Sequence, residues 1–189
     1  MFILASKSPR RVELLKTIVH EFLVKPADID ESSFPLDQVS YEKGKKIASM
    51  YPNDIIISAD TIVTLDNTVY GKPIDKSDAY KILKSLSNRT HKVITYYTII
   101  SVNKKILLNK SITSLVTFND LSDELINEYI ASDSPLDKAG AYGIQDNNQY
   151  PIIKEYQGSL NNIIGFPIEE IKADLISLGL LTNQKKNLS

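Results

Sequence analysis

The chain has 189 residues, 42% of them hydrophobic, and a formal net charge of −1. This length suits one domain with a core of its own, and the near-neutral charge disfavours a general binder of DNA or RNA. The sequence contains no cysteine and two histidines, which excludes disulfide scaffolds, thiolate zinc sites and cysteine nucleophiles. Any metal ion is therefore expected to have oxygen ligands, as Mg²⁺, Mn²⁺ and Ca²⁺ do.

Neither a membrane span nor a secretory signal is recognisable. The longest stretch without a charged residue, residues 156–168, contains Gln, Gly, Ser, Asn and Pro, whereas a membrane span takes about 20 mostly apolar residues. No basic segment precedes an apolar block near the N-terminus. We therefore expect a cytoplasmic protein without membrane contact, formed by one domain over residues 1–182 and a polar tail over 183–189.

The first elements predict a strand, a tight turn and a helix. Residues 2–5 are an apolar run typical of a buried strand. Ser8 and Pro9 are favourable first residues of a helix, and apolar side chains between residues 12 and 19 provide its buried face. A strand followed directly by a helix N-terminus is a layout that binds phosphate, here without a glycine-rich loop.

Alternating strands and helices follow. Strands are predicted at residues 21–25, 54–59, 61–65, 68–70, 91–102 and 106–118, and helices at 36–50, 75–86, 122–131 and 168–180. Asp66-Asn67 indicates the turn of a hairpin, and residues 139–145 predict a loop or a short strand. Because hairpins occur among alternating helices and strands, we predict an α/β fold with a mixed β-sheet flanked by helices.

Arginine is scarce, yet Arg10 and Arg11, two of the three arginines, lie in the first turn of the first predicted helix. A helix N-terminus carries about half a positive charge, so each cation there costs up to ~1 kcal/mol unless an anion lies nearby. Guanidinium groups beside free backbone N–H groups are typical of a phosphate site. The alternative is a surface ion pair with Glu13 or a neighbouring loop.

Asp60 directly follows the apolar strand predicted at residues 54–59, where a carboxylate is costly to bury. Ligands gather at the carboxyl ends of parallel strands, so Asp60 is a candidate metal ligand or general base that activates water. The alternative is a turn aspartate that caps the next segment.

Several other polar residues are candidates for the functional site, and each also has an ordinary structural explanation. Lys72 lies in a loop defined by Gly and Pro neighbours. Glu31 belongs to an acidic group at residues 28–31 that suits a divalent ion or an ordinary surface loop. The amide of Gln145 presents a donor and an acceptor together, as needed to read a base edge. His91 begins a strand, where a structural hydrogen bond is the stronger expectation.

The helix predicted at residues 36–50 carries Lys43, Lys45 and Lys46, which cannot all face one way. A solvated basic face suits two of the three. Gly44, within the same helix, is expected to loosen it by about 0.5–1 kcal/mol relative to Ala.

Short motifs in a fixed order cover the chain from about residue 3 to residue 170. They are Leu4-Ala5-Ser6, Ser8-Pro9-Arg10-Arg11, Asp30-Glu31, Ala59-Asp60-Thr61, Gly71-Lys72-Pro73, Thr90-His91, Asp137-Lys138-Ala139-Gly140-Ala141-Tyr142-Gly143-Ile144-Gln145 and Gly165-Phe166-Pro167. Together they resemble the Maf family of nucleoside triphosphate pyrophosphatases.

The resemblance implies an inosine-triphosphatase-like fold with a deep nucleotide cleft. It also implies hydrolysis of a nucleoside triphosphate between the α and β phosphates, with Mg²⁺ or Mn²⁺ as cofactor. By position, Asp60 is expected as the general base and Glu31 as its partner around the metal. The residues expected to bind phosphate are Ser6, Arg10, Arg11, Lys45 (or Lys46) and Lys72, and those linked to substrate choice are Arg10, Thr61 and Gln145.

The Maf family has one branch that acts on dTTP and UTP and another that prefers 7-methyl-GTP. The Ser-Pro-Arg-Arg opening and the block that ends at Gln145 resemble the first branch, which favours pyrimidine nucleotides, modified ones included. Family members are also associated with septum formation and arrest of cell division, so the alternative is a regulatory nucleotide-binding protein without turnover. A homodimer is the family expectation.

Overall fold

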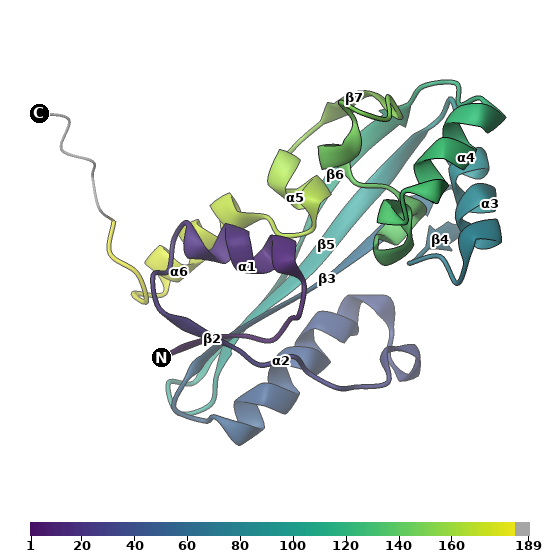
Figure 1. The fold of residues 1–189 in the computed structure, drawn as a ribbon. Helices are drawn as coiled ribbons and strands as arrows, with labels where there is room; N and C mark the ends of the chain where they lie inside the picture. The colour runs from purple at the N-terminus through teal and green to yellow at the C-terminus, as the bar shows by residue number, and fades with distance from the viewer. Residues whose placement is uncertain (184–189) are drawn as a thin grey trace, which may run out of the picture.

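The computed structural model describes residues 1–183 and shows an α/β fold built on a seven-stranded sheet (Figure 1). The strands are β1 (Phe2–Leu4), β2 (Phe22–Val24), β3 (Ile55–Leu65), β4 (Thr68–Tyr70), β5 (Thr90–Ser101), β6 (Ile106–Phe118) and β7 (Ile153–Gln157). The α-helices are α1 (Pro9–Lys16), α2 (Val39–Met50), α3 (Lys76–Leu86), α4 (Asp123–Ala131), α5 (Leu160–Ile164) and α6 (Ile168–Ser177). Short 3₁₀ helices are η1 (Glu31–Ser33), η2 (Leu36–Gln38), η3 (Ser134–Asp137), η4 (Ala139–Ala141) and η5 (Ile144–Asp146).

Of the predicted tail, residues 184–189 lie outside the described residues. Among the helices of residues 1–183, none has the length and apolar character needed to cross a membrane.

The sheet is mixed, as predicted. Its strand order is β2-β1-β3-β5-β6-β7, with β4 paired to β3. The strand β1 runs parallel to β2 and β3, whereas β3, β5, β6 and β7 pair antiparallel. The hairpin expected around Asp66-Asn67 is confirmed by the antiparallel pairing of β3 with β4.

Helices cover both faces of the sheet (Figure 1). On one face, α1 and α6 bury Leu15 and Ile171 in a cluster with Ile57 of β3. On the other face, α2 buries Ile47 in a cluster with Ile56 of the same strand. Neighbouring residues of β3 thus enter different cores, which is why this strand is apolar on both sides.

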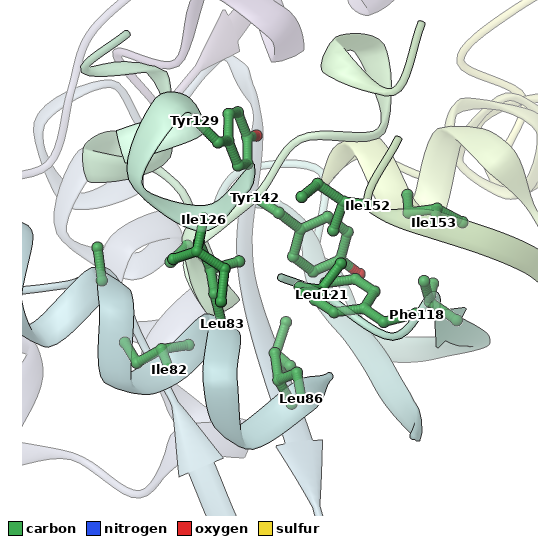
Figure 2. Close-up of a cluster of buried hydrophobic side chains, with 14 of the residues drawn as sticks. Ile82, Leu83, Leu86, Phe118, Leu121, Ile126, Tyr129, Tyr142, Ile152 and Ile153 are labelled. Atoms are coloured by element: carbon green, nitrogen blue, oxygen red, sulfur yellow. The ribbon is translucent and has the colours of Figure 1, made fainter. Parts of the chain in front are cut away.

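A third apolar cluster joins α3 and α4 to the end of the sheet. Figure 2 shows it to include Leu83 of α3, Ile126 of α4 and Phe118 of β6. Tyr142, from the predicted loop at residues 139–145, belongs to the same cluster. The loop is therefore anchored in a core, and it folds as two short 3₁₀ turns rather than as a strand.

The strand β3 is longer than predicted, and this corrects the expected place of Asp60. Asp60 lies in the middle of β3, which continues to Leu65, and not at its end. The neighbouring parallel strand β1 does end nearby, with Leu4 opposite Ile57. Asp60 therefore lies on the part of β3 that extends beyond the carboxyl end of β1, where the general rule for ligand sites still applies.

Local capping follows the prediction at one helix and departs from it at another. The side chain of Asp75 accepts a hydrogen bond from the backbone N–H of Asp78 (2.8 Å), which confirms the expected start of α3. Ser8 makes no such side-chain cap on α1. Its own backbone N–H instead donates to Ser6 Oγ (3.2 Å).

The strand β7 and the helix α5 were not predicted. The strand β7 buries only its first residue, Ile153, so it lacks the alternating pattern that marks a half-buried strand. The helix α5 has five residues, too few for a helical period to show. It begins at Ser159, whose side chain accepts from the backbone N–H of Asn162 (3.0 Å).

Gly44 allows α2 to pack closely against β3. A Cβ atom at this position would lie 2.7 Å from Ser58 Oγ and 3.3 Å from a methyl group of Ile100. Ser58 Oγ cannot easily move away, because it is buried and donates to the carbonyl oxygen of Ser40 (2.6 Å). Close packing therefore outweighs the low helix propensity expected of glycine here.

We expect Gly44→Ala to lower the free energy of unfolding by about 1–3 kcal/mol, although alanine is the better helix former. The reason is the collision of the new methyl group with Ser58 Oγ. Chemical denaturation of the single variants Gly44→Ala and Ser58→Ala and of the double variant measures the effect. Gly44→Ala should cost much less in the Ser58→Ala background, and an equal cost in both backgrounds would contradict this explanation.

Candidate active site

A cleft of about 420 Å³ lies where the N-terminus of α1, the helix α2, the middle of β3 and the loop at residues 137–145 meet. Its lining includes five cationic and three acidic side chains: Arg10, Arg11, Lys43, Lys72 and Lys138 against Glu31, Asp60 and Asp137. Apolar side chains of the lining include Ile62, Val63, Val69, Val93 and Ile163. The cleft therefore combines an excess of positive charge with an apolar surface, which suits an anionic ligand with a flat hydrophobic part.

Asp60 and Glu31 converge on the ammonium group of Lys43. Lys43 Nζ lies 2.6 Å from Glu31 Oε1 and 3.5 Å from Asp60 Oδ1. Burial raises the pKa of Asp60, and the positive charges of Lys43 and Arg11 oppose that rise. The site thus holds a desolvated carboxylate that is stabilised by two cations.

Lys43, and not Lys45, is the lysine of α2 that reaches the cleft, which corrects the sequence-based expectation. The side chain of Lys45 is 57% exposed and pairs weakly with Glu42 (3.8 Å). Lys46, the alternative, donates to the carbonyl oxygen of Asp28. Neither belongs to the lining residues of the cleft within the described chain.

The rotation of α2 explains which lysine enters the cleft. Gly44, Ile47 and Ala48 are buried and form the face of α2 that packs on the sheet. Val39 is buried as well, and around the helix Lys43 lies between Val39 and Ile47. Lys45 lies beyond Ala48 on the other side of Gly44, toward solvent. The apolar residues Val39 and Ile47, which flank Lys43 around the helix, are the sequence signal that could have identified it.

Arg10 lines the cleft at the N-terminus of α1 and makes one long contact. Its Nη1 atom lies 3.4 Å from Asp137 Oδ2, a pair with a neighbouring loop of the kind weighed above. Glu13, the other partner considered, pairs with Lys16 instead (2.7 Å). An exposed and loose ion pair contributes at most about 1 kcal/mol, so the guanidinium of Arg10 remains available to an anionic ligand.

Arg11 and Ser6 are engaged with the protein itself. Arg11 donates from Nε to the Gly165 carbonyl (2.9 Å), from Nη1 to the Ala59 carbonyl (2.9 Å) and from Nη2 to Thr61 Oγ1 (3.2 Å). It also donates from Nη1 to Ser6 Oγ (3.3 Å), and Ser6 is not among the described residues that line the cleft. Burial lowers the pKa of Arg11 to about 10, which leaves it charged at neutral pH.

The structure brings the remaining predicted residues, Lys72, Thr61 and Gln145, to the cleft. The loop that carries Lys72 is joined to the 137–145 loop by a hydrogen bond from the Gly140 N–H to the Gly71 carbonyl (3.1 Å). Lys138, which was not predicted as a site residue, also lines the cleft. Its position next to the small residues that begin at residue 139 was the available signal.

His91 has the structural role that was expected. Its side chain is 1% exposed, and its Nε2 atom hydrogen-bonds the hydroxyl of Tyr142 (2.7 Å). Burial lowers the pKa of His91 to about 4. The imidazole is therefore neutral at pH 7. Through its hydrogen bond to Tyr142, it anchors the loop that also carries Gln145.

The fold and the cleft define an α/β protein with a cationic, carboxylate-containing site for an anionic ligand. A sequence model described as "Maf-like protein" matches residues 1–178, and the chain belongs to this family.

Relatives of similar length cover nearly the whole chain. The "dTTP/UTP pyrophosphatase" of Fusobacterium nucleatum is 38% identical over 183 residues, which are 94% of this chain and 95% of the relative. The protein of the same name from Latilactobacillus sakei is 40% identical over 178 residues, 90% of this chain and 97% of the relative. The one from Thermosipho africanus is 39% identical over 193 aligned positions, 99% and 98% of the two chains.

The buried His91 predicts a loss of stability in acid. The unfolded chain takes up a proton at the ordinary pKa of about 6.5, whereas the folded protein does so only near 4. The stabilisation that comes from burying a neutral His91 is therefore fully present above pH 6.5. As the pH falls from 6.5 toward 4, the free energy of unfolding should decrease by about 3 kcal/mol on this account.

Urea denaturation between pH 7.5 and 4 measures this loss as the difference in unfolding free energy between the wild type and His91→Gln, which keeps a polar partner for Tyr142. His20→Gln, at an exposed position, is the matched control and should follow the wild type. A difference between wild type and His91→Gln that stays constant over this range would contradict the assignment.

Proposed function

We propose that the protein is a nucleoside triphosphate pyrophosphatase that hydrolyses dTTP and UTP to the monophosphate and pyrophosphate. The observation that carries the proposal is the partly buried carboxylate of Asp60, in the middle of β3 and in a cleft lined by five cationic side chains. The printed names of relatives at 38–40% identity support the substrates. Modified pyrimidine nucleotides belong to the same substrate class.

Cationic side chains from separate elements would hold the triphosphate. Arg10 extends from the first turn of α1 and Lys72 from the loop after β4. Lys138 adds positive charge to the lining, while its Nζ atom donates to Ser134 (2.6 and 2.9 Å) and Asp137 (2.9 Å). The helix N-terminus adds backbone N–H groups and a partial positive charge. Positive groups held in place before the reaction stabilise the charge that develops on phosphate oxygens in the transition state.

Asp60 would act as the general base that takes a proton from the attacking water. Burial raises the pKa of Asp60, which makes it a stronger base than an exposed aspartate. The positive charges of Lys43 and Arg11 act in the opposite direction and favour the ionised carboxylate. Asp60 thus combines partial desolvation with cationic neighbours, as a general base requires.

Glu31 and Asp60 fit a divalent cation, Mg²⁺ or Mn²⁺. Both carboxylates already face one cationic group, the ammonium of Lys43. No cluster of three or more His, Cys, Asp or Glu residues arranged for metal binding occurs within residues 1–183, so substrate phosphates and water would complete the coordination, as is usual for Mg²⁺. When bound, the ion would neutralise phosphate charge and polarise the phosphoryl group.

The 137–145 loop and β3 would select the base. Gln145 offers an amide donor and acceptor at the cleft. Thr61 also lines the cleft, with its hydroxyl already bound to Arg11, Thr95 and the Gly165 carbonyl. Apolar neighbours such as Val69 and Ile163 provide a surface for the ring. A polar edge contact over an apolar floor is the usual arrangement for a nucleobase site.

A binding protein without turnover is the weaker candidate for a physical reason. Asp60 and Glu31 carry negative charge in the cleft and repel a triphosphate, so they would reduce the affinity of a site that only binds. Both carboxylates are useful when the site must also activate water and hold a metal ion.

We expect rapid pyrophosphate release from dTTP and UTP in the presence of Mg²⁺ or Mn²⁺. A panel of canonical and modified nucleoside triphosphates, with 7-methyl-GTP included, compares kcat/KM for each. The pyrimidine substrates should exceed 7-methyl-GTP by at least about tenfold, because a hydrogen-bonding site discriminates strongly between base edges. Binding without release across the whole panel would overturn the proposal.

Lys43→Met should lower kcat/KM for dTTP by about 100-fold, because it removes the charge that faces Asp60 and Glu31. Lys45→Met is the matched control on the same helix and should change kcat/KM by about twofold or less, as exposed substitutions do. Steady-state kinetics with dTTP measure kcat/KM for both variants and for the wild type. Equal losses, or a larger loss for Lys45→Met, would contradict the assignment of Lys43 to the site.

A further inference from the structure

Within the described part of the chain, one edge of β3 near Asp60 lacks a neighbouring strand. The strand β5 occupies one edge of β3 from Ile56 to Thr64. On the opposite edge, β1 pairs with residues 55–57 and β4 pairs with residues 63–65. Residues 58–62, with Asp60 at their centre, therefore have no strand partner on this side among residues 1–183.

The side chain of Arg11 takes the place of the missing strand. Nη1 donates to the carbonyl oxygen of Ala59 (2.9 Å), and Nη2 donates to the hydroxyl of Thr61 (3.2 Å). Ala59 and Thr61 are the residues immediately before and after Asp60. The planar guanidinium fork thus holds both sides of the residue proposed as the base.

The same guanidinium joins this edge to the segment between α5 and α6. Nε donates to the carbonyl oxygen of Gly165 (2.9 Å), and this carbonyl also accepts from Thr61 Oγ1 (3.3 Å). Thr61 Oγ1 lies 2.9 Å from Thr95 Oγ1 on β5. Arg11 is therefore one member of a connected polar network that spans β3, β5 and the end of α5.

Arg11 and Arg10, although adjacent in sequence, differ in what they contact. Arg11 directs four hydrogen bonds into the protein, out of the five N–H donors of a guanidinium. Arg10 makes a single long contact with Asp137 (3.4 Å). Moving Arg11 onto a substrate phosphate would leave buried carbonyl groups of β3 and Gly165 without these donors, which is costly.

We propose that Arg11 is a positioning residue that holds the Ala59 carbonyl and the Thr61 side chain on the two sides of Asp60 and places a positive charge beside its carboxylate, and that Arg10 alone of the pair binds phosphate. This inference rests on the proposed function for the role of Asp60. It replaces the expectation that both arginines hold the triphosphate.

The proposal separates binding from turnover. Arg11→Lys keeps a charge but cannot form the fork, so kcat for dTTP should fall about 100-fold, as expected when a catalytic group is misplaced by about 1 Å. Arg11→Lys should bind a non-hydrolysable dTTP analogue, with an imido bridge between the α and β phosphates, with an affinity within about threefold of the wild type. A change of this size is smaller than the 1.4 kcal/mol that corresponds to about tenfold. Arg10→Lys is the matched control, and it should weaken analogue binding while kcat changes less.

Calorimetry gives the affinities, and thermal unfolding verifies that the variants are folded. A loss of analogue affinity of tenfold or more in folded Arg11→Lys, similar to that of Arg10→Lys, would overturn the proposal. Unchanged kcat in Arg11→Lys would also overturn it. A wild type that binds the analogue but hydrolyses no nucleotide would instead refute the proposed function, and the two failures are thereby distinguished.

A second variant tests the fork independently. In Arg11→Ala, guanidinium ions added at millimolar concentration should restore part of the lost kcat, because they can occupy the vacated space and donate to the Ala59 carbonyl and to Thr61. Methylammonium, which has the charge without the planar fork, should restore less. Equal recovery with both ions would show that charge alone matters and would contradict the positioning role.

Discussion

The structure depends on the burial of one carboxylate, that of Asp60, in the middle of a strand. Its side chain is only 16% exposed, and a carboxylate with little water around it needs compensating charge or hydrogen bonds. Lys43 from α2 and Arg11 from α1 provide the charge from opposite faces of the sheet. The close approach of α2 at Gly44 brings Lys43 of the same helix to this carboxylate, and the hydrogen bonds of Arg11 to Ala59 and Thr61 hold its guanidinium beside it.

The arrangement also explains why the chain assembles its site from distant segments. The strand β3 is long, from Ile55 to Leu65, whereas the short strands β1 and β4 each pair with only one end of the same edge of β3. The gap between them exposes Asp60 to the cleft without removing it from the sheet. A rigid central strand thus presents a reactive group with the precision that catalysis requires, while the loops around it contribute Lys72, Lys138 and Gln145.

Much of the fold and part of the site were predictable from sequence. The long strands and amphipathic helices follow local hydrophobic patterns, and Asp60 was recognisable because a carboxylate is unusual beside apolar residues. The choice among the lysines of α2 was not predictable in the same way, because it depends on the helix rotation that Gly44 sets against Ser58. The role of Arg11 was also hidden, since its acceptors at Ala59 and Gly165 are 48 and 154 residues away in the chain.

The most direct test of the central claim is turnover and nucleotide affinity of Asp60→Asn, measured side by side with dTTP and Mg²⁺ or Mn²⁺. Asparagine has the same shape but is no base at neutral pH. The account predicts that pyrophosphate release is abolished while the affinity for dTTP changes by less than about tenfold, or 1.4 kcal/mol. Turnover that persists in a folded Asp60→Asn protein would contradict it.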